Sequence, residues 1–365
     1  RSLMFSDMQS NYCKIIVIRI QMTGTNMLND MISDEKMMMR AIDNATKARP
    51  ACLPNPWVGA VLVSSDAEVF DGYTQKFGQS HAEVICIDKA GARAQGATLY
   101  TTLEPCSHKG KTGPCILKII ESGINRVVIG TKDPDEHVNG AGVSALEDAG
   151  IEVATGLLEN LVVNQLEPYL HHRKTGRPYV IAKIAATMDG KVAAPDGSSQ
   201  WITGAEARRE GHRLRAFSDA ICVGRGTVLA DNPQLTVRDW TPEGGSTESL
   251  DPKRIVLGTI PEEAAIRPCY EHQGSLEELL EKLGDEGVLQ LLVEGGATTL
   301  KAFHEEGLID RYEIFLAPAF MEGDNGMSIF SGNGISTISE LWRGQILEVN
   351  QLGNDLKITI IPEHD

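Results

Sequence analysis

Three short segments in the first half of the chain carry side chains that suit a catalytic zinc site. The segments are His81-Ala82-Glu83, Glu104-Pro105-Cys106 and Gly113-Pro114-Cys115. One imidazole and two thiolates, from His81, Cys106 and Cys115, make three protein ligands for a tetrahedral Zn²⁺ and leave its fourth position for water. Because bound zinc lowers the pKa of that water toward neutrality, the set predicts a hydroxide nucleophile at physiological pH.

Glu83 lies two residues after the histidine, near the start of an expected helix, and is predicted to move protons without binding the metal. This arrangement is the H-x-E plus P-C pattern of zinc deaminases, in which the glutamate shuttles a proton to the departing ammonia. Pro114 suits the first turn of a helix, and it places Cys115 at a helix N-terminus, which favours a thiolate. The spacing departs from the usual pattern, because eight residues separate Cys106 from Cys115.

A second interpretation is a buried histidine beside two inert cysteines, but the glutamate and both prolines favour zinc. His108 is a rival ligand two residues after Cys106, although its loop position favours contact with substrate. The other cysteines lack such partners and are interpreted as core or surface residues: Cys13, Cys52, Cys86, Cys222 and Cys269. An odd total of seven, without regular spacing, indicates a reducing cytoplasm and argues against a disulfide framework.

The elements that must position these side chains alternate between helices and short strands. In the first half we expect helices over residues 34–48, 81–90, 114–122 and 144–150, and strands over 58–63, 98–102, 126–130 and 152–155. The alternation stops at the basic, polar residues 171–178, which are interpreted as a linker. Short apolar strands separated by helices predict α/β layers.

A second α/β series follows the linker. We expect strands over residues 179–185, 220–223, 254–257, 289–293 and 311–316, helices over 206–216, 276–283 and 298–306, and loops over 231–245 and 261–274. A length of 365 residues also favours two domains. The expected division is a leader outside the fold over 1–30, a first domain over 31–175 and a second over 176–365.

The second half offers two candidate phosphate sites, a glycine turn and a pair of arginines, besides a dinucleotide-binding motif that is incomplete. Gly224-x-Gly226 follows a strand, but Leu229 stands where a dinucleotide-binding fingerprint has its third glycine, so that fingerprint fails. Gly295-Gly296 ends a strand and precedes a helix, so backbone amides and the positive helix end face the loop. Arg215 and Arg238 are candidates to clamp a second phosphate bidentately. The alternatives are a glycine turn without ligand and two solvated surface charges.

The charge balance and the apolar pattern exclude other classes of protein. Lysine and arginine total 34 against 50 aspartates and glutamates, a net charge of -16, which disfavours binding to nucleic acid. No apolar run reaches 18 residues, so no membrane-spanning helix is expected. Residues 15–18 are apolar, but Arg19 follows them and no small-residue cleavage site comes next, so we expect no signal peptide.

Residues 50–130 resemble the deaminase domain of the bifunctional riboflavin-biosynthesis enzymes, the diaminohydroxyphosphoribosylaminopyrimidine deaminase–uracil reductases. The matching text is Pro54-Asn55-Pro56-x-Val58-Gly59, His81-Ala82-Glu83 and the segment from Thr101 to Cys115 with its long loop between the cysteines. The resemblance implies a cytidine-deaminase-like three-layer α/β/α domain in which Asn55 contacts the pyrimidine. Gly113 departs from the family, which usually has a second proline there.

Residues 178–360 look like the reductase domain of the same family, which has a dihydrofolate-reductase-like α/β fold. The resemblance rests on residues 183–190, 200–203, 224–238 and 287–296. It implies an NADPH site lined by Ala186, Trp201, Thr227, Asp231, Gly295 and Gly296, and a site for the phosphorylated substrate lined by Ser199, Arg215, Leu235, Arg238 and Glu294. Two features depart from the common form: Gly258 replaces a frequent aspartate, and residues 261–274 leave little room for another strand.

Together the two resemblances imply a bifunctional enzyme. Its first domain deaminates a phosphorylated ribosylamino-pyrimidine, and its second uses NADPH to reduce the ribosyl chain to ribityl. One alternative is a single-activity deaminase with a non-catalytic reductase-like domain, and another is a nucleic-acid deaminase, which the net charge disfavours. We also expect a cytoplasmic homo-oligomer, either a dimer or a tetramer.

Overall fold

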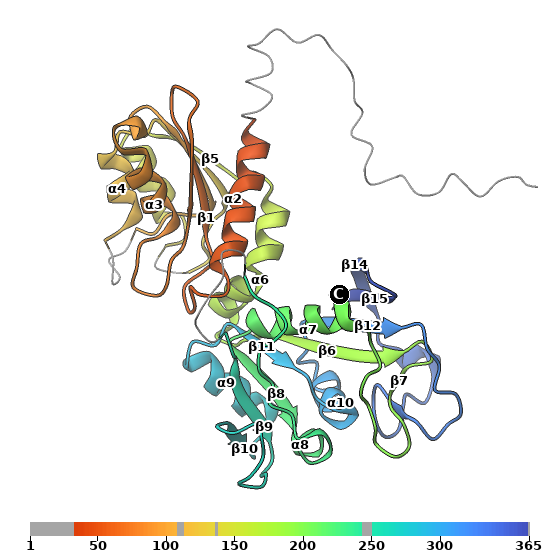
Figure 1. The fold of residues 1–365 in the computed structure, drawn as a ribbon. Helices are drawn as coiled ribbons and strands as arrows, with labels where there is room; N and C mark the ends of the chain where they lie inside the picture. Colours follow the sequence, from red (N-terminus) through yellow and green to blue (C-terminus); the bar gives the residue numbers. More distant parts are fainter. Residues whose placement is uncertain (1–32, 108–112, 136–137, 243–249, 364–365) are drawn as a thin grey trace, which may run out of the picture.

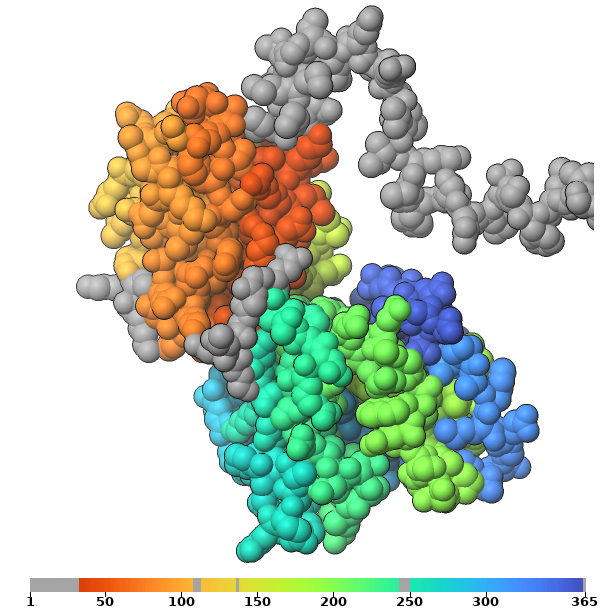
Figure 2. Space-filling view, in the orientation of Figure 1, coloured from red at the N-terminus to blue at the C-terminus, as the bar shows by residue number. Residues whose placement is uncertain are grey.

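A computed structural model of the chain describes residues 33–107, 113–135, 138–242 and 250–363. The expected leader over 1–30, Cys13 and His108 lie outside these ranges. The described chain forms two α/β units, each built around its own sheet (Figure 1). The space-filling view shows them as two masses that meet along one side (Figure 2). Within the described ranges, every helix is too short or too polar to cross a membrane.

The first unit is a five-stranded sheet with helices on both faces. Its strands are β1 (Gly59–Val63), β2 (Val69–Tyr73), β3 (Thr98–Leu103), β4 (Arg126–Thr131) and β5 (Glu152–Thr155), in the order β2-β1-β3-β4-β5. Its helices are α2 (Asp34–Ala48), α3 (Ala82–Ala90), η1 (Gly91–Ala94), α4 (Cys115–Glu121), α5 (Ala141–Asp148) and α6 (Glu159–Thr175). β1 pairs antiparallel with β2 and β3, whereas β3, β4 and β5 run parallel.

Close packing of helices on this sheet depends on small residues at the contacts. α2 begins at a Ser33 cap and buries one face, including Met38 and Ala41, against the sheet. Gly59 of β1 faces α2 so closely that an added Cβ would lie 1.9 Å from the Ala41 carbonyl oxygen. α3 packs on the opposite face, against Gly72 of β2. The result is the expected three-layer α/β/α arrangement, with the zinc-site segments at the starts of α3 and α4.

The second unit is built on an eight-stranded sheet in the order β10-β9-β8-β11-β6-β12-β15-β14. Its strands are β6 (Tyr179–Thr187), β8 (Ala220–Gly224), β9 (Lys253–Leu257), β10 (Tyr270–His272), β11 (Gln290–Val293), β12 (Arg311–Ala317), β14 (Gly344–Leu352) and β15 (Asp355–Pro362). β7 (Lys191–Ala193) and β13 (Met327–Ser328) form a separate ribbon. The helical elements are α7 (Ala205–Ala216), α8 (Arg225–Asp231), α9 (Leu276–Asp285), α10 (Ala297–Glu305) and η2 (Ile338–Glu340).

Alternating side chains of the parallel strands supply two cores in the second unit. Val180, Ala182 and Ile184 of β6 point to the face covered by α9 and α10. The intervening residues Tyr179 and Ile181 point to the face covered by α7 and α8. Burial on both faces explains why these strands have continuous apolar runs in the sequence.

The expected helices and strands are present, and two expectations about the segments between them are wrong. Residues 171–175 are the last turns of α6, a helix that we did not predict, so the connection between the sheets shrinks to residues 176–178. The basic side chains in that last turn suit the negative end of the helix dipole. A strand, β10, forms within 261–274, where a loop was expected, and pairs parallel with β9. The helix expected over 144–150 begins three residues earlier, at Ala141.

Candidate active sites

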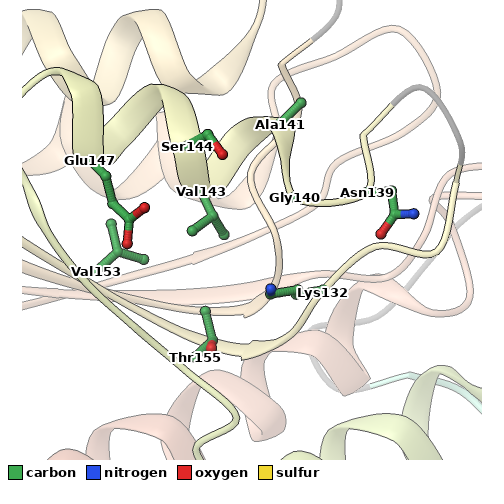
Figure 3. Close-up of a pocket in the computed structure, with 9 residues that line it drawn as sticks. All are labelled: Lys132, Asn139, Gly140, Ala141, Val143, Ser144, Glu147, Val153 and Thr155. Atoms are coloured by element: carbon green, nitrogen blue, oxygen red, sulfur yellow. The ribbon is translucent and has the colours of Figure 1, made fainter.

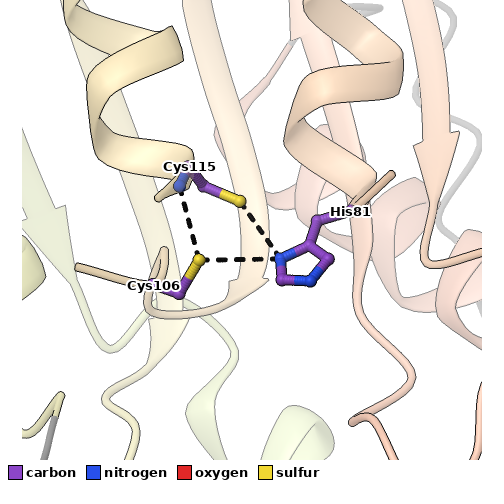
Figure 4. A group of neighbouring side chains, drawn as sticks. All are labelled: His81, Cys106 and Cys115. Atoms are coloured by element: carbon purple, nitrogen blue, oxygen red, sulfur yellow. Dashed lines mark hydrogen bonds between the residues drawn. The ribbon is translucent and has the colours of Figure 1, made fainter. Parts of the chain in front are cut away.

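The three predicted zinc ligands converge in the first unit. His81 caps the start of α3, Cys106 lies in the loop after β3, and Cys115 is the first residue of α4 (Figure 4). The His81 Nδ1 atom lies 3.2 Å from the Cys115 Sγ and 3.6 Å from the Cys106 Sγ. Ligand atoms of a tetrahedral zinc with ordinary bond lengths stand roughly 3.5–3.8 Å apart. The donor set and its spacing therefore fit zinc.

The local electrostatics favours a thiolate at this position. A hydrogen bond from the Cys115 thiol lowers the pKa of Cys106 to about 4, against the opposing effect of burial, and His81 adds a second hydrogen bond. The backbone amide of Cys115, at the start of α4, also donates to the Cys106 sulfur over 3.3 Å. The helix N-terminus therefore stabilises a sulfur anion on Cys106. The sequence predicted the thiolate at Cys115, whose hydrogen bond to Cys106 and burial instead raise the pKa of its thiol.

Glu83 is 3% exposed and lies in the same cavity of about 250 Å³ as His81 and Cys106. Burial raises the pKa of its carboxyl group. Its Oε2 atom has no hydrogen-bond partner among the described residues. A buried carboxylate oxygen normally has a partner, so this atom marks a place for a polar group at the metal.

Glu104, the residue before Pro105-Cys106, fixes the loop that carries the second ligand. It is 3% exposed, and its carboxylate accepts hydrogen bonds from the backbone amides of Asp133, Gly140 and Val143, at 3.3, 3.1 and 3.1 Å. Gly142 packs against it so tightly that an added Cβ would lie 2.4 Å from the Pro105 oxygen. The carboxylate therefore joins the Cys106 loop to the start of α5.

The substrate loop that the resemblance implied also lines this cavity. Pro54, Asn55 and Pro56 form part of its wall, so Asn55 shares one space with His81 and Glu83. The backbone N–H of Asn55 donates to the Cys52 carbonyl over 3.0 Å, which closes the loop into a tight turn.

The lining residues that were not predicted include Asp133, Asp135, Tyr169 and Arg173. The hydroxyl of Tyr169 donates to both carboxylate oxygens of Asp133, at 3.3 and 3.0 Å. Arg173 lies over the Tyr169 ring, and its Nε is 3.8 Å from a carboxylate oxygen of Asp135. Arg173 belongs to the basic stretch 171–178 that the sequence analysis singled out. Because that stretch was interpreted as a linker, Arg173 was not predicted to lie at the site.

A larger cavity of about 590 Å³ opens elsewhere on the first unit, around the start of α5 and the strand β5 (Figure 3). Nine residues line it: Lys132, Asn139, Gly140, Ala141, Val143, Ser144, Glu147, Val153 and Thr155. None of these is a predicted site residue or a zinc ligand. The chemistry of the unit therefore lies in the smaller, more enclosed cavity.

In the second unit, the predicted NADPH residues gather at one edge of the sheet. β8, β11 and β6 are neighbours and run parallel, so their carboxyl ends meet. Ala186 lies at the end of β6, Thr227 in α8 directly after β8, and Gly295-Gly296 between β11 and α10. In open parallel sheets, ligands bind beyond these carboxyl ends.

The Gly295-Gly296 turn has the form expected of a phosphate cradle. Gly296 caps α10, and its amide donates to the Thr227 hydroxyl over 3.1 Å, which ties this turn to α8. The remaining amides at the start of a nine-residue helix suit the phosphates of NADPH. Gly258 follows β9 with a φ of 99°, a left-handed conformation that disfavours the aspartate common in the family.

Arg215 does not form the predicted two-arginine clamp. Its Nε and Nη2 atoms face Glu294, at 2.7 and 2.8 Å from the two carboxylate oxygens, and its Nη1 donates to the Thr236 carbonyl. The guanidinium is therefore already engaged bidentately with a carboxylate. Arg238 is exposed, two residues beyond Thr236.

Lys183 is the residue of this unit that the prediction missed. It projects from β6, and its Nζ lies 4.0 Å from a Glu294 carboxylate oxygen. Burial raises the pKa of Glu294, but the charges of Arg215 and Lys183 outweigh it and bring the pKa to about 2. A lysine inside an otherwise apolar strand, 179–187, was the available signal.

The remaining predicted residues lie around this edge. Ser199 hydrogen-bonds the Asp231 carboxylate at the end of α8, where burial raises the pKa of the aspartate. Leu235 is buried, whereas Trp201 is 68% exposed, with the Arg208 guanidinium 4.8 Å from its ring centre. Placement alone leaves their roles as predictions.

Comparison with known proteins gives two matching family models. Residues 31–131 match the cytidine and deoxycytidylate deaminase zinc-binding region, and residues 178–358 match the RibD C-terminal domain. Riboflavin biosynthesis protein RibD from Bacillus amyloliquefaciens is 37% identical over 364 residues, which cover 90% of this chain and 96% of the relative. The RibD protein of Escherichia coli is 34% identical over 367 residues, 90% of this chain and 100% of the relative.

Solved structures agree with these matches. Acinetobacter baumannii RibD, form 1, superposes with a TM-score of 0.84 at 35% identity, over 91% of this chain and 99% of that chain. A Thermotoga maritima protein, described as a diaminohydroxyphosphoribosylaminopyrimidine deaminase/5-amino-6-(5-phosphoribosylamino)uracil reductase, superposes with a TM-score of 0.80 at 35% identity. That match covers 90% of this chain and 98% of the other.

Proposed function

The chain belongs to the RibD family of riboflavin-biosynthesis enzymes, and from this premise we propose which of its residues carry each activity. It is a bifunctional enzyme with a zinc-dependent deaminase domain and an NADPH-dependent reductase domain. Residues 31–131 match the deaminase model, residues 178–358 match the reductase model, and the RibD relatives align over both, so the alternative of a single-activity deaminase has no support. We assign the deaminase to residues 31–175 and the reductase to residues 176–365.

In the deaminase, His81, Cys106 and Cys115 hold the zinc. When bound, the zinc supplies a Lewis acid that makes water a nucleophile at neutral pH. Glu83 would take up a proton from the attacking water at its unpartnered Oε2 atom and pass it to the amino group that leaves as ammonia. Asn55 lines the same cavity and would hydrogen-bond the pyrimidine ring.

We assign the recognition of the substrate phosphate in this domain to Arg173. The described lining of the cavity contains four carboxylates, from Glu83, Glu104, Asp133 and Asp135, and one guanidinium. A phosphorylated substrate brings further negative charge to this space, so a cation must offset it. Arg173 is only loosely paired with Asp135 and stands at the end of the cavity formed by α6.

In the reductase, NADPH supplies the hydride that converts the ribosyl chain to ribityl. We assign its phosphates to Thr227 and to the Gly295-Gly296 turn at the start of α10, while Ala186, Trp201 and Asp231 complete its site. Glu294, ionised and fixed by Arg215, receives hydrogen bonds from the ribose hydroxyls of the substrate. Because Arg215 is engaged in this way, we assign the substrate phosphate to the exposed Arg238. Ser199 and Leu235 are assigned to the same substrate site.

The observation that carries the deaminase assignment is the convergence of three zinc ligands and the unpartnered Glu83 carboxylate in one cavity. The test measures zinc content and ammonia release for the wild type and the Glu83→Gln variant. We expect about one zinc per chain in both, with ammonia release abolished in the variant and NADPH-dependent reduction of the deaminated intermediate retained. A variant that deaminates normally would remove Glu83 from the mechanism.

We propose that the enzyme is a cytoplasmic homo-oligomer that acts on small molecules and binds no nucleic acid. The described cysteines are free, which suits a reducing compartment. The edge strand β14 exposes Ile346, Leu347 and Val349, and an open apolar edge is suited to pairing with a second copy. Analytical ultracentrifugation should show a dimer or larger assembly, and Ile346→Glu should shift it toward monomer.

A further inference from the structure

Arg49 follows α2 in the deaminase domain, but its side chain ends inside the reductase domain. The residue is 4% exposed, and its Nη2 donates to the Phe217 carbonyl and to the Gln290 side-chain oxygen, both at 2.7 Å. Burial lowers the pKa of Arg49 to about 10, with Asp219 opposing the shift, so the group is still charged at neutral pH. A buried charge of this kind holds its position only through its partners.

The same guanidinium also contacts the deaminase domain, because its Cζ atom lies over the ring of Trp57, 3.3 Å from the ring centre. Trp57 is 2% exposed and donates to the Gln165 carbonyl over 2.9 Å. Between Arg49 and Trp57 the chain forms the loop 50–56 that presents Asn55 to the cavity. Both ends of the substrate loop are therefore fixed by one arginine.

The reductase surface beneath this loop is a rigid frame. Gln290 begins β11, and its amide group donates to the Ser218 hydroxyl over 2.8 Å. The Asp219 carboxylate accepts from the backbone amides of Leu289 and Gln290, both at 2.9 Å. Gly287 lies against the loop, because an added Cβ would be 3.8 Å from the Pro54 side chain. These residues lie at the amino ends of β8 and β11, opposite the edge assigned to NADPH.

We propose that Arg49 is a positioning residue for deamination, and that docking on the reductase domain holds the loop in the conformation in which Asn55 meets the pyrimidine. The inference rests on the proposed role of this cavity. Without the arginine, the loop loses its anchor on the second domain while the zinc ligands keep theirs. The reductase domain then supports deamination by holding the substrate loop in place, and it contributes no group to the reaction itself.

The test compares Arg49→Met and Gln290→Met in the full chain, one variant from each side of the contact. Both should raise the KM for deamination about 10-fold and change kcat less than 2-fold. Zinc content and NADPH-dependent reduction of the deaminated intermediate should stay at wild-type values. Arg40→Met is the control, since Arg40 lies on the same α2 helix and pairs with Asp71 inside the first domain.

A wild-type KM in both variants overturns the proposal. So does loss of zinc or of reduction, which would indicate a general structural defect. The result is separable from a failure of the proposed function, because in that case the wild type itself would not deaminate the substrate. If Arg49→Met does not fold, Gln290→Met still decides the question, because its substrate loop keeps the natural sequence.

Discussion

Arg215 and Glu294 form a two-pronged ion pair between α7 and the end of β11, with both hydrogen bonds shorter than 2.9 Å. The side chains are 16% and 9% exposed, so water screens the pair weakly. Lys183 adds a second positive charge 4.0 Å from the same carboxylate. One buried anion therefore compensates two cations at the edge of the sheet where the reductase substrates bind.

Replacing Glu294 with glutamine should destabilise the reductase domain by about 3 kcal/mol, because it leaves two buried cations without their anion. Urea unfolding of the full chain measures the loss in the transition of this domain. Glu286→Gln is the matched control, since Glu286 pairs with Lys253 on the surface and such pairs contribute at most about 1 kcal/mol. Equal effects of the two substitutions would contradict the buried network.

The same pair predicts a pH dependence. The pKa of Glu294 is about 2 in the folded chain, well below the ordinary value of roughly 4.3 for an unfolded glutamate. A depressed carboxyl pKa adds stability that is complete above the unfolded value and is lost as the pH falls toward the folded one. The difference in unfolding free energy between wild type and Glu294→Gln should therefore be constant above pH about 5 and shrink between about 4.3 and 2. A difference that stays constant to pH 2 would be inconsistent with it.

The zinc ligands were predictable because they lie in short sequence motifs. His81 and Glu83 are two residues apart, and each cysteine follows a proline, so the pattern survives without knowledge of the fold. The strands near these segments were also predictable, because burial on both faces leaves continuous apolar runs such as Gly59–Val63. Local sequence and local burial carried the same signal in these elements.

Tertiary contacts account for what the sequence did not reveal. The apolar residues Val162, Leu166 and Tyr169 of α6 do stand at helical spacing, but Pro168 and the polar, basic last turn made the segment resemble a linker. Arg173 enters the deaminase cavity only because this helix packs beside β4. In the reductase, Arg215 was expected to bind phosphate because the sequence does not show that Glu294, 79 positions away, already occupies its guanidinium.

Glu104→Gln should weaken zinc binding about 10- to 100-fold, although Glu104 is not a ligand. Its carboxylate accepts three backbone hydrogen bonds that hold the Cys106 loop, and an amide group would turn a donor toward those N–H groups. Competition with a chelator at neutral pH measures the affinity. Glu147 is exposed on α5, the helix whose first turn bonds to Glu104, and Glu147→Gln should leave the zinc affinity unaltered. Unchanged affinity in Glu104→Gln would mean that the ligands position themselves.

Arg173→Met should raise the KM for the phosphorylated substrate about 10-fold and leave kcat nearly unchanged. A hydrogen bond to a charged group contributes roughly 1.5–3 kcal/mol, which is the free energy the methionine cannot supply. The informative comparison uses the same pyrimidine without its phosphate, for which wild type and variant should have equal KM values. Lys174→Met controls for loss of a neighbouring positive charge, because Lys174 lies outside the cavity lining. If Arg173→Met weakens both substrates alike, the arginine shapes the cavity and does not recognise phosphate, and a KM equal to wild type for the phosphorylated substrate would assign that recognition to another group.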